Sequence, residues 1–248
     1  MNKMIEINNV LNGLSLSVDE GSFCTVLGSG GSGKTTLARV LIGLEETKGT
    51  IKISASIDEM VCLFENPNNQ LYTDTVREEI LYAANAAGLS IDKFEKKIVK
   101  LNELIPISKL LDKEINSLSS SEKQLIVLIS ALFQFPNVLI LDESISMMDS
   151  KLKEKVYKLL SMYNKNGMTI VNMTSNVEDC MHGDTVIILN NKTVVYQGKL
   201  NEALKKDFFT DNGIKAPFIT ELTSKLKYYK VVKKVHYNIH SLAGELWG

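Results

Sequence analysis

A glycine-rich octapeptide near the N-terminus constrains the fold more than any other feature of this sequence. Residues 28–35 read Gly-Ser-Gly-Gly-Ser-Gly-Lys-Thr and fit the pattern G-x-x-x-x-G-K-[ST]. The apolar run Phe23 to Leu27 precedes the loop with strand character, and Thr35 to Leu44 follows it with helical periodicity. In this arrangement, backbone N–H groups and the helix N-terminus converge on phosphate oxygens. The sequence therefore predicts a strand, a phosphate-binding loop and a helix in succession.

The side chains of this loop suit a nucleoside triphosphate with a magnesium ion. Lys34 can reach the β- and γ-phosphates, and the Thr35 hydroxyl can coordinate Mg²⁺. A flexible Gly/Ser loop without a ligand is the alternative, and the Lys-Thr pair between strand and helix disfavours it. We assign nucleotide binding to Gly28, Ser29, Gly30, Gly31, Ser32, Gly33, Lys34, Thr35 and Thr36.

Two carboxylates follow a later apolar run. Val138 to Leu141 suits a buried strand, and Asp142 and Glu143 come directly after it. Asp142 would hold Mg²⁺ through water or Thr35, and Glu143 would polarise the attacking water as a general base. The alternative interpretation is that both residues only cap the next helix.

Strand-like and helix-like segments alternate along the chain, which predicts an α/β fold with a mostly parallel sheet and helices on its faces. Two helices at 75–87 and 92–105 indicate a helical insert rather than more sheet, and a hairpin is expected around Asn190 and Asn191. Beyond Gly198 the pattern is helical and loop-like. The expected strands are 4–7, 14–18, 23–27, 50–53, 60–64, 138–141, 169–173, 185–189 and 193–197, and the other helices are 35–44, 119–133 and 150–166.

The composition narrows the class of protein. The 248 residues are 44% hydrophobic and 23% charged with a formal net charge of −1, which fits one soluble globular domain and disfavours a nucleic-acid binder acting by bulk charge. We expect no signal peptide, and no apolar run reaches the roughly 18 residues of a spanning helix. Any membrane role would then act through a partner. The isolated cysteines are expected to be reduced core residues: Cys24, Cys62 and Cys180.

Two features near the C-terminus leave alternatives open. Lysines and tyrosines interleave from Lys225 to Lys234, which indicates a solvated amphipathic element or, as the alternative, a contact with lipid headgroups or nucleic acid. Trp247 is apolar enough to dock on a partner, although a single terminal tryptophan more often packs on its own domain.

The order of the motifs resembles that of the nucleotide-binding subunit of ABC transporters. Five segments after the phosphate loop stand where this family has its Q-loop, its LSGGQ signature, its acidic strand end, its D-loop and its switch histidine. In that order they are Phe64 to Pro67, Leu118 to Glu122, Asp142 and Glu143, Ser146 to Asp149, and Thr174 to Asn176.

Two further stretches resemble the energy-coupling factor (ECF) and cobalt-type branch of this family. Asn66 to Gln70 looks like its NPDNQ run, and Ile214 to Leu222 is similar to the PF-x-T-E-L element of its C-terminal extension. The resemblance implies a P-loop NTPase with an ABC-type core, an antiparallel β subdomain and a helical subdomain at about 66–134. It places the ATPase domain at 1–212 and an ECF-type extension at 213–248. It also implies ATP and Mg²⁺ as cofactors.

The catalytic positions depart from the family pattern. The Q-loop glutamine is Glu65, which can still offer an oxygen to Mg²⁺ but adds negative charge, so we expect modest impairment. The switch histidine is Ser175, whose side chain is shorter, and the loss of one transition-state donor lowers a rate by about 10²–10³-fold. His182 is not at the motif position and is interpreted as a surface residue at a helix end. The resemblance therefore implies Glu143, Lys34 and Ser175 as catalytic positions and Thr35, Asp142 and Glu65 as metal positions.

The signature also departs from the pattern. Ser120 and Ser121 replace two glycines and Glu122 replaces glutamine, while Ser119 is kept and can still donate to a γ-phosphate. Ser119 and Glu122 also form a capping box for the following helix, so a signature that supports no hydrolysis is the equal alternative. No tyrosine or phenylalanine precedes Phe23, so the aromatic residue that stacks on adenine in this family is missing.

The resemblance implies a peripheral subunit at the cytoplasmic face of the cell membrane. Its partners would be a second ABC ATPase, a transmembrane T component and a substrate-binding S component, with no nucleic acid. A homodimer would place every altered motif in both sites, which favours a heterodimer. We expect ATP hydrolysis to drive uptake of a vitamin or metal ion. The alternatives are a hydrolytically impaired subunit of the same complex and a soluble ABC protein of translation or DNA repair.

Overall fold

A six-stranded sheet forms the centre of the computed structural model, which describes residues 2–11, 13–146, 148–205, 209, 214, 217–236 and 239–247. Its strand order is β5-β6-β7-β3-β8-β9, and every neighbouring pair is parallel except β8 and β9. Three strands are buried along their whole length, as expected for a sheet covered on both faces. The strands are β3 (Phe23–Gly28), β5 (Met60–Leu63), β6 (Val138–Asp142), β7 (Thr169–Thr174), β8 (Thr185–Asn190) and β9 (Thr193–Lys199).

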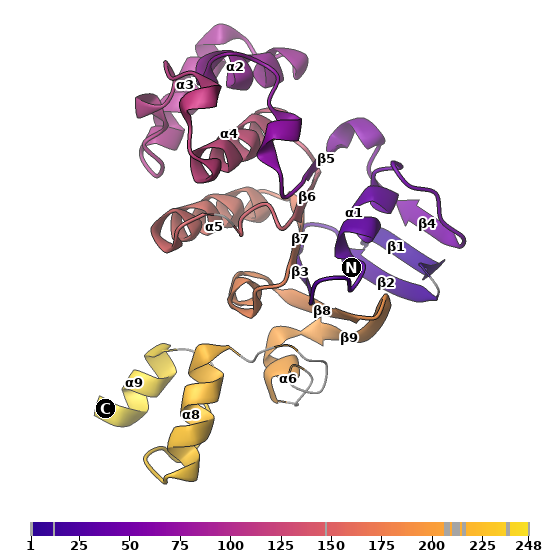
Figure 1. The fold of residues 1–248 in the computed structure, drawn as a ribbon, viewed down its shortest axis with the longest axis vertical. Coiled ribbons are helices and arrows are strands. Elements are labelled where there is room, and N and C mark those ends of the chain that lie inside the picture. The colour runs from indigo at the N-terminus through magenta and orange to yellow at the C-terminus, as the bar shows by residue number, and fades with distance from the viewer. Residues whose placement is uncertain are drawn as a thin grey trace.

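A second, antiparallel sheet lies beside the first (Figure 1). Its order is β2-β1-β4, formed by β1 (Lys3–Val10), β2 (Leu14–Asp19) and β4 (Thr50–Ile53). Helix α1 (Lys34–Leu41) packs between the two sheets, where Leu37 shares one apolar cluster with Ile5 of β1 and Ile140 of β6. The phosphate loop at the start of α1 is therefore supported from both sides.

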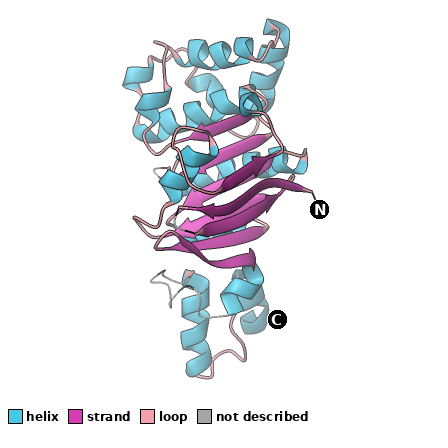
Figure 2. Ribbon diagram, turned by 90° about the vertical axis from the view of Figure 1, so that its right-hand side faces the viewer, coloured by secondary structure: helices cyan, strands magenta, loops and turns pink. Residues whose placement is uncertain are grey.

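A helical unit stands at one end of the central sheet (Figure 2). It contains η2 (Pro67–Gln70), α2 (Val76–Ala86), α3 (Ile91–Asn102), η3 (Ile107–Lys109), η4 (Ile115–Ser117) and α4 (Ser120–Phe133). Residues Gln124 to Phe133 of α4 are all buried, because this helix lies between the unit and the sheet. Helix α5 (Ser150–Lys165) joins the same apolar cluster through Val156 and Leu160.

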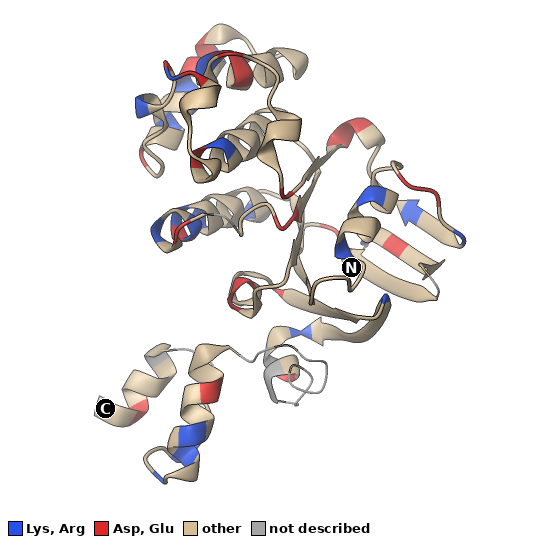
Figure 3. Ribbon diagram, in the orientation of Figure 1, with Lys and Arg blue, Asp and Glu red and all other residues tan. Residues whose placement is uncertain are grey.

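The C-terminal elements lie at the opposite end of the molecule (Figure 2). They are α6 (Leu200–Lys205), α8 (Phe218–Tyr228) and α9 (Ile239–Trp247), whereas η5 (Val177–His182) follows β7 and packs against the central sheet. The backbone N–H of Phe218 donates to Glu178 Oε1 at 2.8 Å, which ties the start of α8 to η5. Helix α5 is mostly basic, with five lysines and one glutamate, and α8 carries one glutamate and two lysines (Figure 3).

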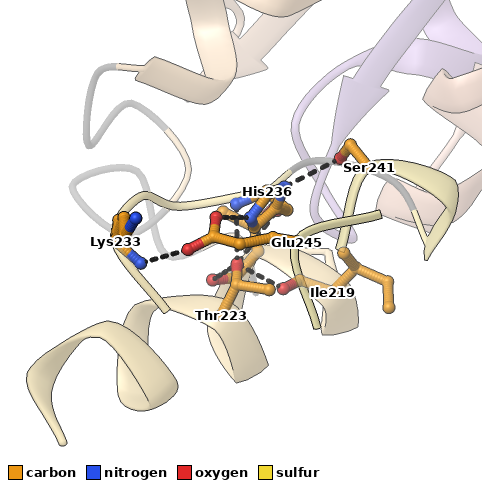
Figure 4. A network of polar contacts seen from close by, with 7 residues as sticks. Ile219, Thr223, Lys233, His236, Ser241 and Glu245 are labelled. Carbon is orange, nitrogen blue, oxygen red and sulfur yellow. Dashed lines mark hydrogen bonds and ion pairs between the residues drawn. The ribbon is translucent and has the colours of Figure 1, made fainter. Parts of the chain in front are cut away.

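A buried polar network holds α8 and α9 together (Figure 4). The Thr223 hydroxyl accepts from the His236 backbone N–H at 3.1 Å and lies 2.9 Å from the His236 carbonyl oxygen. The His236 ring contacts Ser241 Oγ at 3.0 Å and Glu245 Oε2 at 2.6 Å, and Glu245 also accepts from the Lys233 backbone N–H. The turn after α8 is thereby joined to both helices.

The architecture confirms the expected α/β fold with a mostly parallel sheet, an antiparallel sheet and a helical unit. The three cysteines are free and buried, as predicted. The expectation that Trp247 packs on its own domain is wrong, since its side chain is 82% exposed. Lys215 and Ala216 of the predicted C-terminal element, and Met147 of the predicted D-loop, lie outside the described residues. Within the described part of the chain, no helix combines the length and apolar character needed to cross a membrane.

Candidate functional site: a phosphate-loop cleft

The phosphate loop leaves β3 at the carboxyl edge of the central sheet and ends at α1. Gly31 and Gly33 have φ values of +78° and +104°, a left-handed backbone conformation that favours glycine. The loop opens into a cleft of about 560 Å³. Its lining residues are Gly30, Gly31, Ser32, Gly33, Lys34, Thr35, Thr36, Glu65, Glu143, Ser146, Ser175 and Lys192.

Lys34 is the buried cation of this cleft. Its Nζ donates to the carbonyl oxygens of Gly28 and Ser29 at 2.7 and 3.2 Å, and lies 3.4 Å from Glu143 Oε1. Only 6% of the side chain is exposed. Phosphate oxygens are strong acceptors for such an ammonium group, so a phosphate bound in the loop would compete for these donor positions.

Glu143 is positioned by an unusual backbone conformation at the end of β6. Its φ is +52°, which is costly for a non-glycine residue, and its N–H donates to the Met173 carbonyl at 2.9 Å. Ser146 Oγ donates to the Glu143 carbonyl at 2.6 Å. The strand pairing and the following turn thus fix the carboxylate at the cleft beside Lys34.

Asp142 fits a magnesium ligand. Its Oδ1 is buried and has no hydrogen-bond partner among the described residues. Burial raises the pKa of this carboxyl above its ordinary value, the hydrogen bond from Thr35 lowers it, and the charges of Glu143 and Glu65 raise it. No three acidic, histidine or cysteine side chains in the described part of the chain form a metal site by themselves. Mg²⁺ commonly takes one or two protein ligands together with water and nucleotide phosphates, which suits Thr35 and Asp142.

Asp142→Asn should raise the melting temperature of the nucleotide-free protein by about 2–4 °C at pH 7. A shift of this size corresponds to a gain of roughly 1 kcal/mol in the free energy of unfolding for a chain of this length. With its raised pKa, folded Asp142 holds a proton more strongly than unfolded Asp142, so wild-type stability falls as the pH rises through that pKa. Thermal melts from pH 4 to 8 would test this difference.

The control is Asp112→Asn, because the Asp112 side chain is 93% exposed. We expect Asp112→Asn to melt like the wild type, and Asp142→Asn to lose the Mg²⁺-dependent part of any stabilisation by ATP. A nucleotide-free Asp142→Asn protein that melts below the wild type at pH 7 would contradict our interpretation of Asp142.

The other predicted positions divide into two groups. Ser175, directly after β7, lines the cleft together with Lys34 and Glu143. Thr35 and Glu65 line both the cleft and an adjoining groove of about 680 Å³, and Asp142 lines the groove alone. The residues predicted for catalysis and for the metal are therefore brought to one edge of the sheet, although their chemical roles stay predictions.

Ser119 does not line this cleft. Its hydroxyl accepts from the Glu122 backbone N–H at 3.2 Å and donates to Glu122 Oε2 at 2.9 Å, while the Ser119 N–H donates to the same oxygen. Lys113 Nζ lies 3.2 Å from Glu122 Oε1. The capping-box interpretation of this segment is confirmed, and nucleotide binding by Ser119 stays a prediction that requires a second chain.

His182 lies at the end of η5, as expected, with its ring stacked on Tyr157 at 3.8 Å between centroids. Burial lowers the pKa of this histidine, and the charges of Asp179 and Glu154 act in the opposite direction. It is absent from the residues lining the phosphate-loop cleft.

Sequence reasoning missed Lys192 and Ser146 as cleft residues. Ser146 belongs only to a predicted loop motif, and Lys192 belongs to none of the predicted motifs or turn positions. A signal existed for Lys192, since a two-residue hairpin turn favours glycine at its second position and this one has lysine. The pairing of β8 with β3, which brings the turn to the phosphate loop, was not predicted.

The sequence is similar to a known family and to several known proteins. The sequence profile of the family described as ABC transporter matches residues 11–146. The energy-coupling factor transporter ATP-binding protein EcfA1 of Fusobacterium nucleatum is 33% identical over 228 residues, covering 86% of this chain and 86% of that protein. EcfA of Malacoplasma penetrans, which carries the same description, is 29% identical over 234 residues, covering 89% and 82%.

Solved structures share the fold. cbiO1 from Clostridium perfringens, described as part of the ABC transporter complex cbiONQ, has a TM-score of 0.74 at 22% identity, covering 92% of this chain and 96% of that chain. A nucleotide-free ATP-binding cassette from an ABC transporter has a TM-score of 0.71 at 19% identity, covering 86% and 100%.

Proposed function

The chain belongs to the ABC transporter family, and from this premise we propose that it is the ATP-binding subunit of an energy-coupling factor importer. The observation that carries the proposal is the single cleft in which Lys34, Glu143 and the phosphate loop meet. The similarity to EcfA proteins over most of the chain supports the choice of transporter type.

Within the cleft, each side chain receives one role. The loop N–H groups and Lys34 bind the phosphates, and Thr35 and Asp142 would hold Mg²⁺, to which Glu65 could offer a further oxygen. Mg²⁺ would neutralise charge on the phosphate oxygens. Glu143 takes the proton of the attacking water as general base. Ser175 occupies the position of the γ-phosphate donor with a short hydroxyl.

The groove beside the cleft is our candidate docking place for the membrane partner. It runs between α1 and η2, and its rim carries the exposed apolar side chains Leu44 and Tyr72, at 68% and 77% exposure. Thr35 and Asp142 line the same groove. An element of a transmembrane subunit seated there would therefore sense the state of the nucleotide site.

We place the chain as a peripheral subunit at the cytoplasmic face of the membrane, with residues 1–212 as the ATPase domain and 213–248 as the extension. The capping box of Ser119 and the serine at position 175 favour pairing with a second, more regular ABC ATPase. A T component would carry the docking element. An S component would recognise the micronutrient, a vitamin or a metal ion.

A second candidate is a subunit that binds nucleotide but hydrolyses it slowly. The engagement of the Ser119 hydroxyl by Glu122 favours this candidate, because that hydroxyl must leave its partner before it can donate to a phosphate. The position of Glu143 beside Lys34 favours the first. Turnover in the assembled complex separates them.

Co-purification tests the assignment to a transporter. The tagged chain, expressed with its native membrane partners and extracted in detergent, should retain a hydrophobic T component and a second ATPase. Leu44→Glu and Tyr72→Glu should each release the T component, because a charge at the rim opposes burial there. Val99→Glu is the control, since Val99 is an exposed apolar residue of α3 outside the groove. Recovery of no membrane protein with the wild type would contradict the proposal.

A further inference from the structure

Lys192 lies in the tight turn between β8 and β9, next to the phosphate loop. The parallel register of β3 and β8 places Gly28 opposite Leu189. The residues that follow Leu189 therefore emerge beside the residues that follow Gly28. This pairing brings a turn from late in the sequence to the nucleotide cleft.

The turn contacts the loop through backbone and side chain. The Lys192 N–H donates to the Ser32 carbonyl at 3.1 Å, and a Cβ placed on Gly33 would lie 3.3 Å from Lys192 Cγ. Lys192 is exposed and lines the cleft together with Lys34. The aliphatic stem thus rests on the loop, and the side chain forms part of the wall that faces a ligand.

The backbone at Lys192 is in a conformation that disfavours lysine. Asn190 pairs with Thr193, and the two residues between them, Asn191 and Lys192, have φ values of +48° and +62°. Such a turn favours asparagine followed by glycine, because residues with a Cβ are strained in the left-handed region. A strained backbone at the rim of a ligand site points to a function of the side chain.

The carboxylates of the cleft explain why a second cation is needed there. Its charged lining side chains are the cations Lys34 and Lys192 and the carboxylates Glu65 and Glu143. Without Lys192, two carboxylates would face an incoming polyphosphate with one cation. A second ammonium group balances them and attracts the ligand.

We propose that Lys192 is a second phosphate-binding cation of this cleft, retained at a strained turn position because its charge is needed there. The inference rests on the proposed function, because it takes a nucleoside di- or triphosphate as the ligand. Lys192 acts on the phosphate tail and not on the base, so it contributes equally to all such nucleotides.

Three variants separate charge from backbone strain. Lys192→Met keeps the stem and removes the charge, and it should raise the Kd of Mg-ATP and Mg-GTP by about the same factor, on the order of fivefold at low salt. Lys192→Arg should stay within about twofold of the wild type. Lys192→Gly should weaken nucleotide binding like Lys192→Met but raise the melting temperature, because glycine relieves the strained turn.

Lys230→Gly is the matched control. Lys230 is also an exposed lysine with a φ of +60°, but it lies in the turn after α8. We expect its replacement to raise the melting temperature and leave the Kd unchanged. The Kd of the wild type should rise more steeply with salt concentration than the Kd of Lys192→Met. Salt screens the attraction between Lys192 and the phosphates, and the methionine variant lacks that attraction.

Calorimetric titration with Mg-ATP and Mg-GTP measures the Kd of the wild type and of each variant. A Kd for Lys192→Met equal to that of the wild type would overturn the inference, as would a loss confined to one of the two nucleotides, which would place Lys192 on the base. The variant Lys34→Met distinguishes a wrong role for Lys192 from a wrong proposed function. If the wild type and Lys34→Met both fail to bind nucleotide, the function is wrong, and not only the role of Lys192.

Discussion

Glu143→Gln in this chain alone should lower ATP turnover by the assembled complex by about 100- to 1000-fold. The carboxylate stands at the cleft 3.4 Å from Lys34, at a strained backbone position held by β7 and Ser146. An amide of nearly the same shape cannot accept the proton of the attacking water, and general bases contribute about 10²–10⁴-fold. Steady-state phosphate release by the purified complex measures the loss.

Binding controls separate this loss from a loss of the nucleotide. Glu143→Gln leaves Lys34 and the phosphate loop unchanged, so Mg-ATP should bind as tightly as before, or more tightly because one negative charge is gone. Unchanged turnover would mean that the partner's site hydrolyses ATP. This chain would then contribute nucleotide binding without catalysis.

Ser175→His should raise turnover by about tenfold or more. Ser175 is exposed and lines the cleft with Glu143, so an imidazole has room to extend toward a γ-phosphate. A preorganised transition-state donor contributes about 10²–10³-fold, and an engineered one recovers part of this. The measurement is turnover of the complex at saturating Mg-ATP.

Two further variants give this prediction its controls. Ser175→Ala should change turnover by less than about threefold, because a short hydroxyl contributes little as a donor at this position. Ser175→His combined with Glu143→Gln should be as slow as Glu143→Gln alone. A Ser175→His rate equal to that of the wild type would show that the missing histidine does not limit the reaction.

The parts of this fold predicted from sequence are those in which local pattern and tertiary environment agree. Gly31 and Gly33 fit the left-handed positions of the loop, and the apolar run before Asp142 fits a fully buried strand. Ser119 and Glu122 form their capping box within one turn of helix, where neighbouring residues decide the outcome. Such features need little knowledge of the rest of the chain.

The missed features depend on distant contacts. Lys192 reaches the cleft only because β8 pairs with β3 across more than half of the chain, and no local pattern encodes that register. Trp247 is expected to pack on its own domain because large apolar side chains are usually buried. In α9, however, Leu242 is buried and Trp247 is exposed. In both cases the tertiary arrangement, and not propensity, decided the position of the side chain.

The site departs from the family pattern in its side chains and not in its backbone. The loop, the strand end at Glu143 and the pairing around it are intact, whereas Glu65, Ser175 and the Ser119 capping box change charge and hydrogen bonding. A cleft of this kind is built to bind a nucleotide. Under the proposed pairing with a second ABC ATPase, its rate of hydrolysis would depend on what that partner contributes to the site.

Calorimetric titration of the isolated chain with Mg-ATP tests the central claim, that the chain binds this nucleotide through its phosphate loop. We expect saturable, Mg²⁺-dependent binding by the wild type and a Kd at least about 100-fold higher for Lys34→Met, which keeps the buried stem and removes a charged donor worth about 3 kcal/mol. Equal affinities for the two proteins, or a folded wild type without binding, would contradict the account.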